Sequence, residues 1–255
     1  MISRNPYSEK IIKEYNSYGK DKTIELIDNA QKSFLDWKRF KLDERLRTIE
    51  KIKSNLISKK IECANKITEE MGKPIKESIA EIEKCVWLCD YYFENGNKFL
   101  KDEIIKTEAT KSYVSFEPLG GILGIMPWNF PFWQVFRFVI PAILSGNTTM
   151  VKHASNVSGC CLMIEEIFSY QIDCKTFYSL LLPSSKINHV IKAPIIKAIS
   201  LTGSEKAGSS VGAIAGSEIK KILLELGGAD AFIVCKDADL TKASEKAVLG
   251  RMLNT

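Results

Sequence analysis

Three polar side chains in this 255-residue sequence stand at or just after short apolar runs, where they could act on a small molecule. Asn129 follows the run 122–126, Lys152 closes a run that starts at residue 148, and Glu225 closes another that starts at residue 222. An amide can stabilise a developing negative charge, an ammonium can bind hydroxyl or phosphate groups, and a carboxylate can take up a proton. Together they suggest an enzyme or a ligand-binding domain.

The residues around Asn129 and Lys152 predict a parallel α/β sheet. Glycines at 120–121 and Pro127 bracket the apolar run 122–126, which is typical of a short buried strand. A mostly apolar segment follows, then the break at 145–147 and a second strand that ends at Lys152. Ligands of such sheets bind at the carboxyl ends of the strands, so we expect Asn129 and Lys152 to emerge at one edge.

The flanking regions supply the rest of the predicted scaffold. Apolar stripes at helical spacing predict N-terminal helices at 23–40, 43–71 and from residue 74, and the extended segments 104–107 and 111–116 predict a hairpin. After Lys152, strands and helices alternate as in a doubly wound fold. The predicted strands are 176–181, 197–201, 219–225 and 231–235, and the predicted helices are 158–170, 186–191, one from residue 204 and one from residue 240.

Composition narrows the class of protein. The net charge of +5 comes from scattered lysines, so nucleic acid is not an expected partner. The longest apolar run, 130–144, is too short to span a bilayer, and the N-terminus shows no secretory signal. Seven cysteines without a CxxC pair indicate reduced, buried thiols in a cytoplasmic protein, and only two histidines are available, so no metal site is expected.

Residues 118–152 resemble the aldehyde dehydrogenase superfamily. They read PLGGILGIMPWNFPFWQVFRFVIPAILSGNTTMVK, and a strand ending in PWNFP with a lysine on the next strand is the hallmark of that superfamily. LTGS at 201–204 and ELGG at 225–228 follow in the same order. The resemblance runs from about Thr23 to Thr255 and corresponds to the N-terminal half of a full-length member. It implies N-terminal helices and a Rossmann-like parallel sheet, truncated before most of the catalytic domain.

The resemblance also implies a domain organisation and partners. Residues 1–100 would be the helical part of the cofactor domain, 101–118 an oligomerisation hairpin, 119–228 the NAD(P)-binding core and 229–255 the start of an incomplete catalytic domain. We therefore expect a homo-oligomer or a complementary C-terminal half, with a small aldehyde as substrate.

Two residues receive catalytic roles from the resemblance. Asn129 would donate to the anionic oxygen of a thiohemiacetal, although it could instead only cap a turn. Glu225 would be a general base whose pKa is raised by its apolar surroundings, or else a structural carboxylate at a strand end.

The resemblance assigns cofactor binding to a second set of residues. Lys152 would bind the ribose or a phosphate together with Ser155, at a position where NAD-preferring relatives carry a glutamate that repels a 2′-phosphate. Serine accepts either cofactor, so we expect NADP or dual use. Gly203 and Ser204 precede a helix and would bind the pyrophosphate, although a Gly–Ser pair there is more often a simple N-cap. Met126, Trp128 and Leu226 complete the expected cofactor site.

The substrate prediction depends on Arg137, eight residues after Asn129. The succinic-semialdehyde members of the superfamily carry arginine there to hold the far carboxylate, and an internal salt bridge is the alternative. The expected reaction is oxidation of succinic semialdehyde to succinate with reduction of NAD(P)+. The nucleophilic cysteine is expected just past Thr255, since Cys235 is predicted to lie on a buried strand, so the isolated chain should not turn over. The rival hypothesis is an inactive remnant or a dinucleotide-binding fragment of a disrupted gene.

Overall fold

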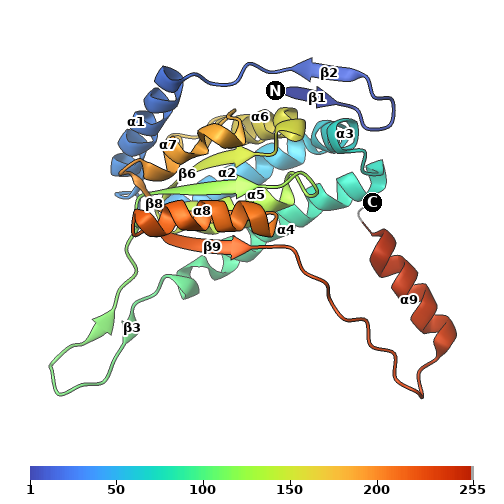
Figure 1. Cartoon of the computed structure of the whole chain (residues 1–255). Coiled ribbons are helices and arrows are strands. Elements are labelled where there is room, and N and C mark those ends of the chain that lie inside the picture. The colour runs from blue at the N-terminus through green and yellow to red at the C-terminus, as the bar shows by residue number, and fades with distance from the viewer. Residues whose placement is uncertain (254–255) are drawn as a thin grey trace.

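The computed structural model describes residues 1–253 and shows layers of helices on both faces of a central sheet (Figure 1). The central sheet has five parallel strands in the order β7-β6-β5-β8-β9, which confirms the predicted α/β fold. Its strands are β5 (Gly121–Met126), β6 (Thr148–His153), β7 (Phe177–Ser179), β8 (Ile196–Thr202) and β9 (Lys221–Glu225). β6 is buried along its whole length, as expected for an inner strand of a covered parallel sheet.

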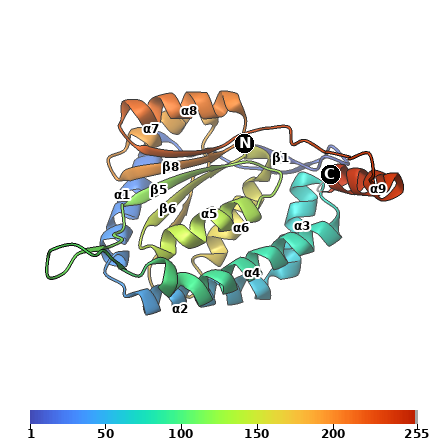
Figure 2. The same ribbon diagram turned by 90° about the horizontal axis from the view of Figure 1, so that it is seen from below.

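Helices cover the two faces unequally (Figure 2). One face carries α1 (Lys20–Trp37), α7 (Ile187–Lys192) and α8 (Glu205–Ser217). The other carries α5 (Trp133–Leu144) and α6 (Ser158–Ile167), with α2 (Leu42–Ser58), α3 (Lys60–Met71) and α4 (Ile75–Phe99) packed behind them. Short 3₁₀ helices, η1 (Ser155–Val157) and η2 (Ser184–Lys186), follow β6 and β7. The helices α5 and α6 are therefore buried between the sheet and an outer helical layer.

Three segments lie at the periphery. β1 (Ile2–Arg4) and β2 (Ile11–Glu14) form an antiparallel hairpin, as do β3 (Glu103–Ile104) and β4 (Tyr113–Val114), which extend away from the body (Figure 1). After β9 an extended segment, 226–239, leads to α9 (Leu240–Met252), which stands apart from the sheet (Figure 1).

The structure departs from two sequence predictions and contains one element that was not predicted. The strand at 231–235 is absent, because its apolar residues Phe232, Ile233 and Val234 are exposed and no described strand lies beside them to form a ladder. The single helix predicted for 43–71 is interrupted at Lys59, where α2 ends and α3 begins. The hairpin of β1 and β2 was not predicted at all.

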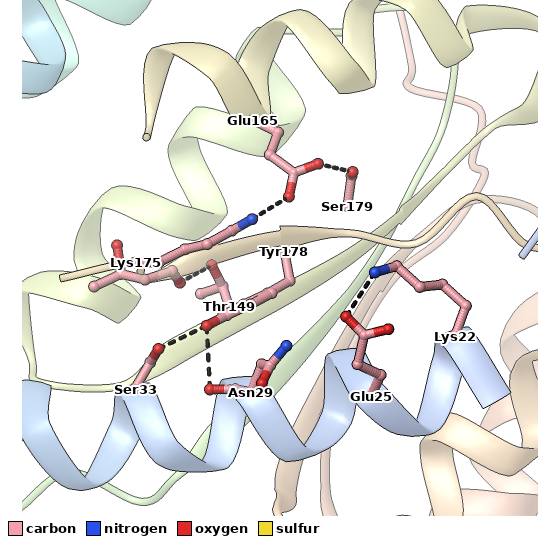
Figure 3. Close-up of polar contacts among 10 residues, drawn as sticks. Lys22, Glu25, Asn29, Ser33, Thr149, Glu165, Lys175, Tyr178 and Ser179 are labelled. Carbon is pink, nitrogen blue, oxygen red and sulfur yellow. Dashed lines mark hydrogen bonds and ion pairs between the residues drawn. The ribbon is translucent and has the colours of Figure 1, made fainter. Parts of the chain in front are cut away.

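The edge strand β7 shows how alternating residues join the layers (Figure 3). Tyr178 points to α1, where its hydroxyl donates to the carbonyl oxygen of Asn29 (3.1 Å) and lies 2.6 Å from the Ser33 hydroxyl. The next residue, Ser179, points the other way and donates to Glu165 of α6. Successive side chains of a strand face opposite sides, so one short strand anchors a helix on each face.

Gly124 lets α5 approach the sheet closely. A Cβ atom at this position of β5 would lie 2.6 Å from Cε1 of Phe138 on α5. We predict that Gly124→Ala lowers the free energy of unfolding by about 1–3 kcal/mol, because the overpacked ring must move. Urea unfolding followed by circular dichroism measures this change.

The matched control is Gly216→Ala in α8, where an added Cβ would meet no atom within 4 Å. Alanine favours a helix over glycine, so this variant should be as stable as the unmodified chain or slightly more stable. Equal unfolding midpoints for Gly124→Ala and the unmodified chain would refute the packing argument.

Candidate functional site

The parallel strands bring most of the predicted site residues to one edge of the sheet. Lys152 pairs in register with Ile125 of β5, and Glu225 pairs with Thr202 of β8. The carboxyl ends of all five strands lie at this edge, as parallel pairing requires. The segments that leave it are 126–133, 152–158, 180–186, 202–205 and 225–226.

The turn after β5 presents Asn129, which is partly buried, beside Trp128, whose side chain is half exposed. His153 ties this turn to β6. The backbone N–H of Ala154 donates to His153 Nδ1 (2.9 Å), so the proton lies on Nε2, which donates to the carbonyl oxygen of Pro131 (2.8 Å). The ring is fully buried, and burial lowers the pKa of His153 to about 4. A neutral histidine therefore fixes the position of the Asn129 turn.

Lys152 is only 8% exposed at the end of β6. Its ammonium donates to the hydroxyl of Ser184, 3.2 Å away in the turn after β7, and burial lowers the pKa of this lysine. Ser155, the predicted companion of Lys152, is exposed in η1. Sequence reasoning missed Ser184, although Pro183 before it marks the end of a strand at the same edge.

The N-terminus of α8 combines the two alternatives considered for the Gly–Ser pair. The hydroxyl of Ser204 accepts from the N–H of Ala207 (3.3 Å), so its side chain does act as an N-cap. The N–H of Gly203 donates to the carbonyl oxygen of Glu225 (3.0 Å) and joins β8 to β9. Leu226 packs against α8 at Gly208, where a Cβ would lie 2.6 Å from its Cδ2. The helix N-terminus and its dipole remain suited to an anion.

Arg137 and Glu225 meet at a cavity of about 440 Å³ on the α5 side of the sheet. Its lining includes Met126, Gln134, Arg137, Phe138, Thr202 and Glu225. The two charged side chains form an ion pair and are 35% and 41% exposed. The internal salt bridge considered for Arg137 is therefore present. The apolar burial expected to raise the pKa of Glu225 is absent, because its strand end is open on this side.

Gln134 is a polar residue of this cavity that the sequence analysis did not select. Its Oε1 atom is buried and has no hydrogen-bond partner among the described residues. Gln134 lies three residues before Arg137 in α5, so the two share a helix face. The spacing of three residues from Arg137 is the feature of the sequence that could have indicated Gln134.

The seven cysteines differ in burial and fall into three groups. Five are buried, and burial raises the pKa of the thiols, to about 12 for Cys63 and Cys89. Cys174 is partly buried, with its pKa raised to about 11. The prediction that Cys235 lies on a buried strand is wrong, since it is exposed on the extended segment 226–239.

Residues 1–253 contain neither a metal-binding cluster nor a membrane-spanning helix. No group of three or more histidine, cysteine, aspartate or glutamate side chains in this range could hold a metal ion. Within the same range, every helix is too short or too polar to cross a membrane.

Comparisons with known proteins identify the family and the fold of this chain. The sequence profile of the aldehyde dehydrogenase family matches residues 1–255. A probable succinate-semialdehyde dehydrogenase (NADP(+)) of Synechocystis is 40% identical over 98% of this chain and 55% of its own length. A succinate semialdehyde dehydrogenase (NAD(P)+) of Escherichia coli is 41% identical over 100% of this chain and 55% of its own. The chain thus spans about half the length of these curated relatives.

A solved structure of a succinic semialdehyde dehydrogenase has the same fold over the length of this chain. The succinic semialdehyde dehydrogenase of Streptococcus pyogenes, in complex with NADP+, superposes with a TM-score of 0.95 at 27% identity. The match covers 99% of this chain and 56% of that one.

The buried neutral His153 predicts acid sensitivity. Its pKa of about 4 in the folded chain lies below the ordinary value of 6.5, so the unfolded chain binds this proton first as the pH falls. The stability that this histidine contributes is complete above pH 6.5 and is lost toward pH 4, by about 3 kcal/mol. Urea unfolding at a series of pH values measures this loss.

In His153→Gln the free energy of unfolding should depend less steeply on pH between 6.5 and 4 than in the unmodified chain. His189→Gln is the control, because His189 is the other histidine and is exposed. An unchanged slope in His153→Gln would contradict the assignment.

Proposed function

The chain belongs to the aldehyde dehydrogenase family, and we propose that it forms the dinucleotide-binding part of an enzyme that oxidises succinic semialdehyde to succinate. The main support is the buried ammonium of Lys152, which lies at the same sheet edge as the N-terminus of α8. A desolvated lysine that donates to a neutral hydroxyl is costly to bury, and such a group is suited to an anionic or polyhydroxyl ligand.

The residues present fit a dinucleotide. Lys152 and Ser184 would hold the ribose hydroxyls or a 2′-phosphate, and the exposed Ser155 puts no competing carboxylate three residues after Lys152. The N-terminus of α8 would receive the pyrophosphate, and Met126, Trp128 and Leu226 would flank the cofactor. Serine at position 155 and the NADP(+) in the relatives' names favour NADP+, with NAD+ as a second ligand.

The chemistry divides among this chain's own residues. When bound, the dinucleotide supplies the hydride acceptor that oxidation of an aldehyde requires. The amide of Asn129 would donate to the aldehyde oxygen as negative charge develops on it. Glu225 would take up the proton of the attacking group or of water. Its ion pair with Arg137 holds the carboxylate of Glu225 beside the cavity.

Arg137 is the proposed determinant of the substrate. Its guanidinium lies at the mouth of the cavity and is open enough to bind a second carboxylate. Gln134 adds an amide on the same helix face. A semialdehyde with a terminal carboxylate would place its acid at Arg137 and its aldehyde toward the turn of Asn129.

We place the nucleophilic thiol of this enzyme outside the described residues. The buried cysteines are held protonated by their surroundings, and Cys235 lies on the segment that leaves the sheet. A second polypeptide or a further segment would then complete the site. The protruding hairpin of β3 and β4 offers an unpaired strand edge for contact with a second copy.

Calorimetry with NADP+ and NAD+ tests the proposal. We predict saturable binding of NADP+, weakened about tenfold or more in Lys152→Met, because a charge-assisted hydrogen bond is lost. Ser155→Glu should weaken NADP+ by a similar factor but leave NAD+ nearly unchanged, since the new carboxylate repels only the 2′-phosphate.

Lys197→Met provides the matched control. This exposed lysine lies near the amino end of β8, at the opposite end of the strands from the proposed site. It should bind both dinucleotides as the unmodified chain does. A folded chain that binds neither dinucleotide would refute the proposed function, and equal losses in Lys152→Met and Lys197→Met would refute the assigned site.

A further inference from the structure

A buried ion pair lies directly behind the turn that presents Asn129. Lys73 follows Gly72, which ends α3 with a left-handed backbone (φ 83°), and Glu81 lies on α4. The side chains of Lys73 and Glu81 are each only 1% exposed, and their charged groups pair within the layer of α3, α4 and α5. Neither residue belongs to the sequence motifs or to the cavity described above.

Glu81 caps α5 from another helix. Its Oε1 atom accepts from the backbone N–H groups of Phe132 (2.8 Å) and Trp133 (3.0 Å), and its other oxygen pairs with Lys73. The residue that precedes α5, Phe132, has no side chain able to cap it. Amides at a buried helix start need an acceptor, and a carboxylate there also interacts favourably with the helix dipole.

Lys73 extends the support to the preceding residues. Its ammonium lies 3.9 Å from the ring centroid of Phe130, which directly follows Asn129. The carbonyl of Pro131, the next residue, accepts from His153. Each residue of the stretch 130–133 is therefore held by a buried ionisable side chain, and Asn129 is the first residue beyond it.

The energetics of a buried ion pair indicate that Lys73 and Glu81 position neighbouring groups and add little stability beyond that of an apolar pair. Two charges lose their hydration when buried, and a pair of apolar residues of similar volume is often as stabilising. What the apolar pair would lack is a fixed acceptor for α5 and a cation for Phe130. We propose that Lys73 and Glu81 are positioning residues that fix the turn 128–133, and with it Trp128 and Asn129. This inference rests on the proposed function for the roles of those two side chains.

The test compares two double variants. Lys73→Met/Glu81→Leu removes both charges at similar volume and leaves two amides of α5 without their acceptor. We expect hydrogen exchange at Phe132 and Trp133, measured by NMR, to become about tenfold faster or more and the melting temperature to fall, because two amides lose their acceptor. Lys73→Met/Glu81→Gln retains a carbonyl oxygen for these amides and should restore slow exchange. That rescue distinguishes an acceptor from mere packing.

Ligand affinity gives a second readout. 2′,5′-ADP contains only the adenosine half of NADP+, which Lys152 and α8 would hold. Lys73→Met/Glu81→Leu should bind NADP+ more weakly but 2′,5′-ADP as tightly as the unmodified chain. Lys66→Met/Glu69→Leu is the control, because this ion pair on α3 is far more exposed than Lys73 and Glu81 (26% and 43% against 1% each). It should change neither the exchange rates nor the affinities.

Three results would overturn the inference: unchanged exchange at Phe132 and Trp133, no rescue by glutamine, or equal losses of affinity for both ligands. If the unmodified chain binds neither ligand, the proposed function fails instead. The exchange rates then still decide whether Lys73 and Glu81 position the turn.

Discussion

The helices that follow β5 and β6 both begin beneath an outer layer of helices, where their first amides are buried or partly buried. Two glutamates from that layer supply the acceptors. Glu81 binds the start of α5, and Glu70 of α3 binds the amides of Gly159 and Cys160 at the start of α6, each at 2.9 Å. Because a strand, its turn and its helix are continuous, fixing these helix starts also fixes the turns that carry the candidate site residues.

This constraint explains several features that otherwise look unrelated. A Cβ at position 159 would lie 2.7 Å from Glu70, so glycine is required where the carboxylate reaches α6. Tyr15 of the N-terminal segment lies beside Glu70, and burial with this neighbouring charge raises the pKa of Tyr15 to about 12. The N-terminal hairpin is thereby joined to the support of α6. On the other turn, Lys73 and His153 complete the support around Pro131.

The sequence was sufficient for much of the fold and for the place of the site. Local apolar runs with glycine and proline breaks located the strands of the parallel sheet, and the positions of Asn129 and Lys152 at or just after strand ends predicted their shared edge. Contacts between residues far apart in the sequence could not be predicted from such local patterns. Glu81 reads as part of an amphipathic helix, and only the tertiary packing of α4 on α5 brings it to Phe132. The partner of Lys152, Ser184, lies 32 residues further along the chain. The prediction of a strand at 231–235 is wrong for the same reason. Its apolar pattern indicates a tendency to form a strand, but the pattern does not show whether a neighbouring strand is present to pair with it.

We propose that the carboxyl edge of this sheet binds a dinucleotide. Hydrogen–deuterium exchange of the chain, read by mass spectrometry with and without saturating NADP+, tests it most directly. Binding at this edge should protect peptides that contain residues 152–158, 183–187 and 203–208, and the turn 128–133. Protection confined to other surfaces, such as the hairpin of β3 and β4, or no protection at saturation, would contradict it.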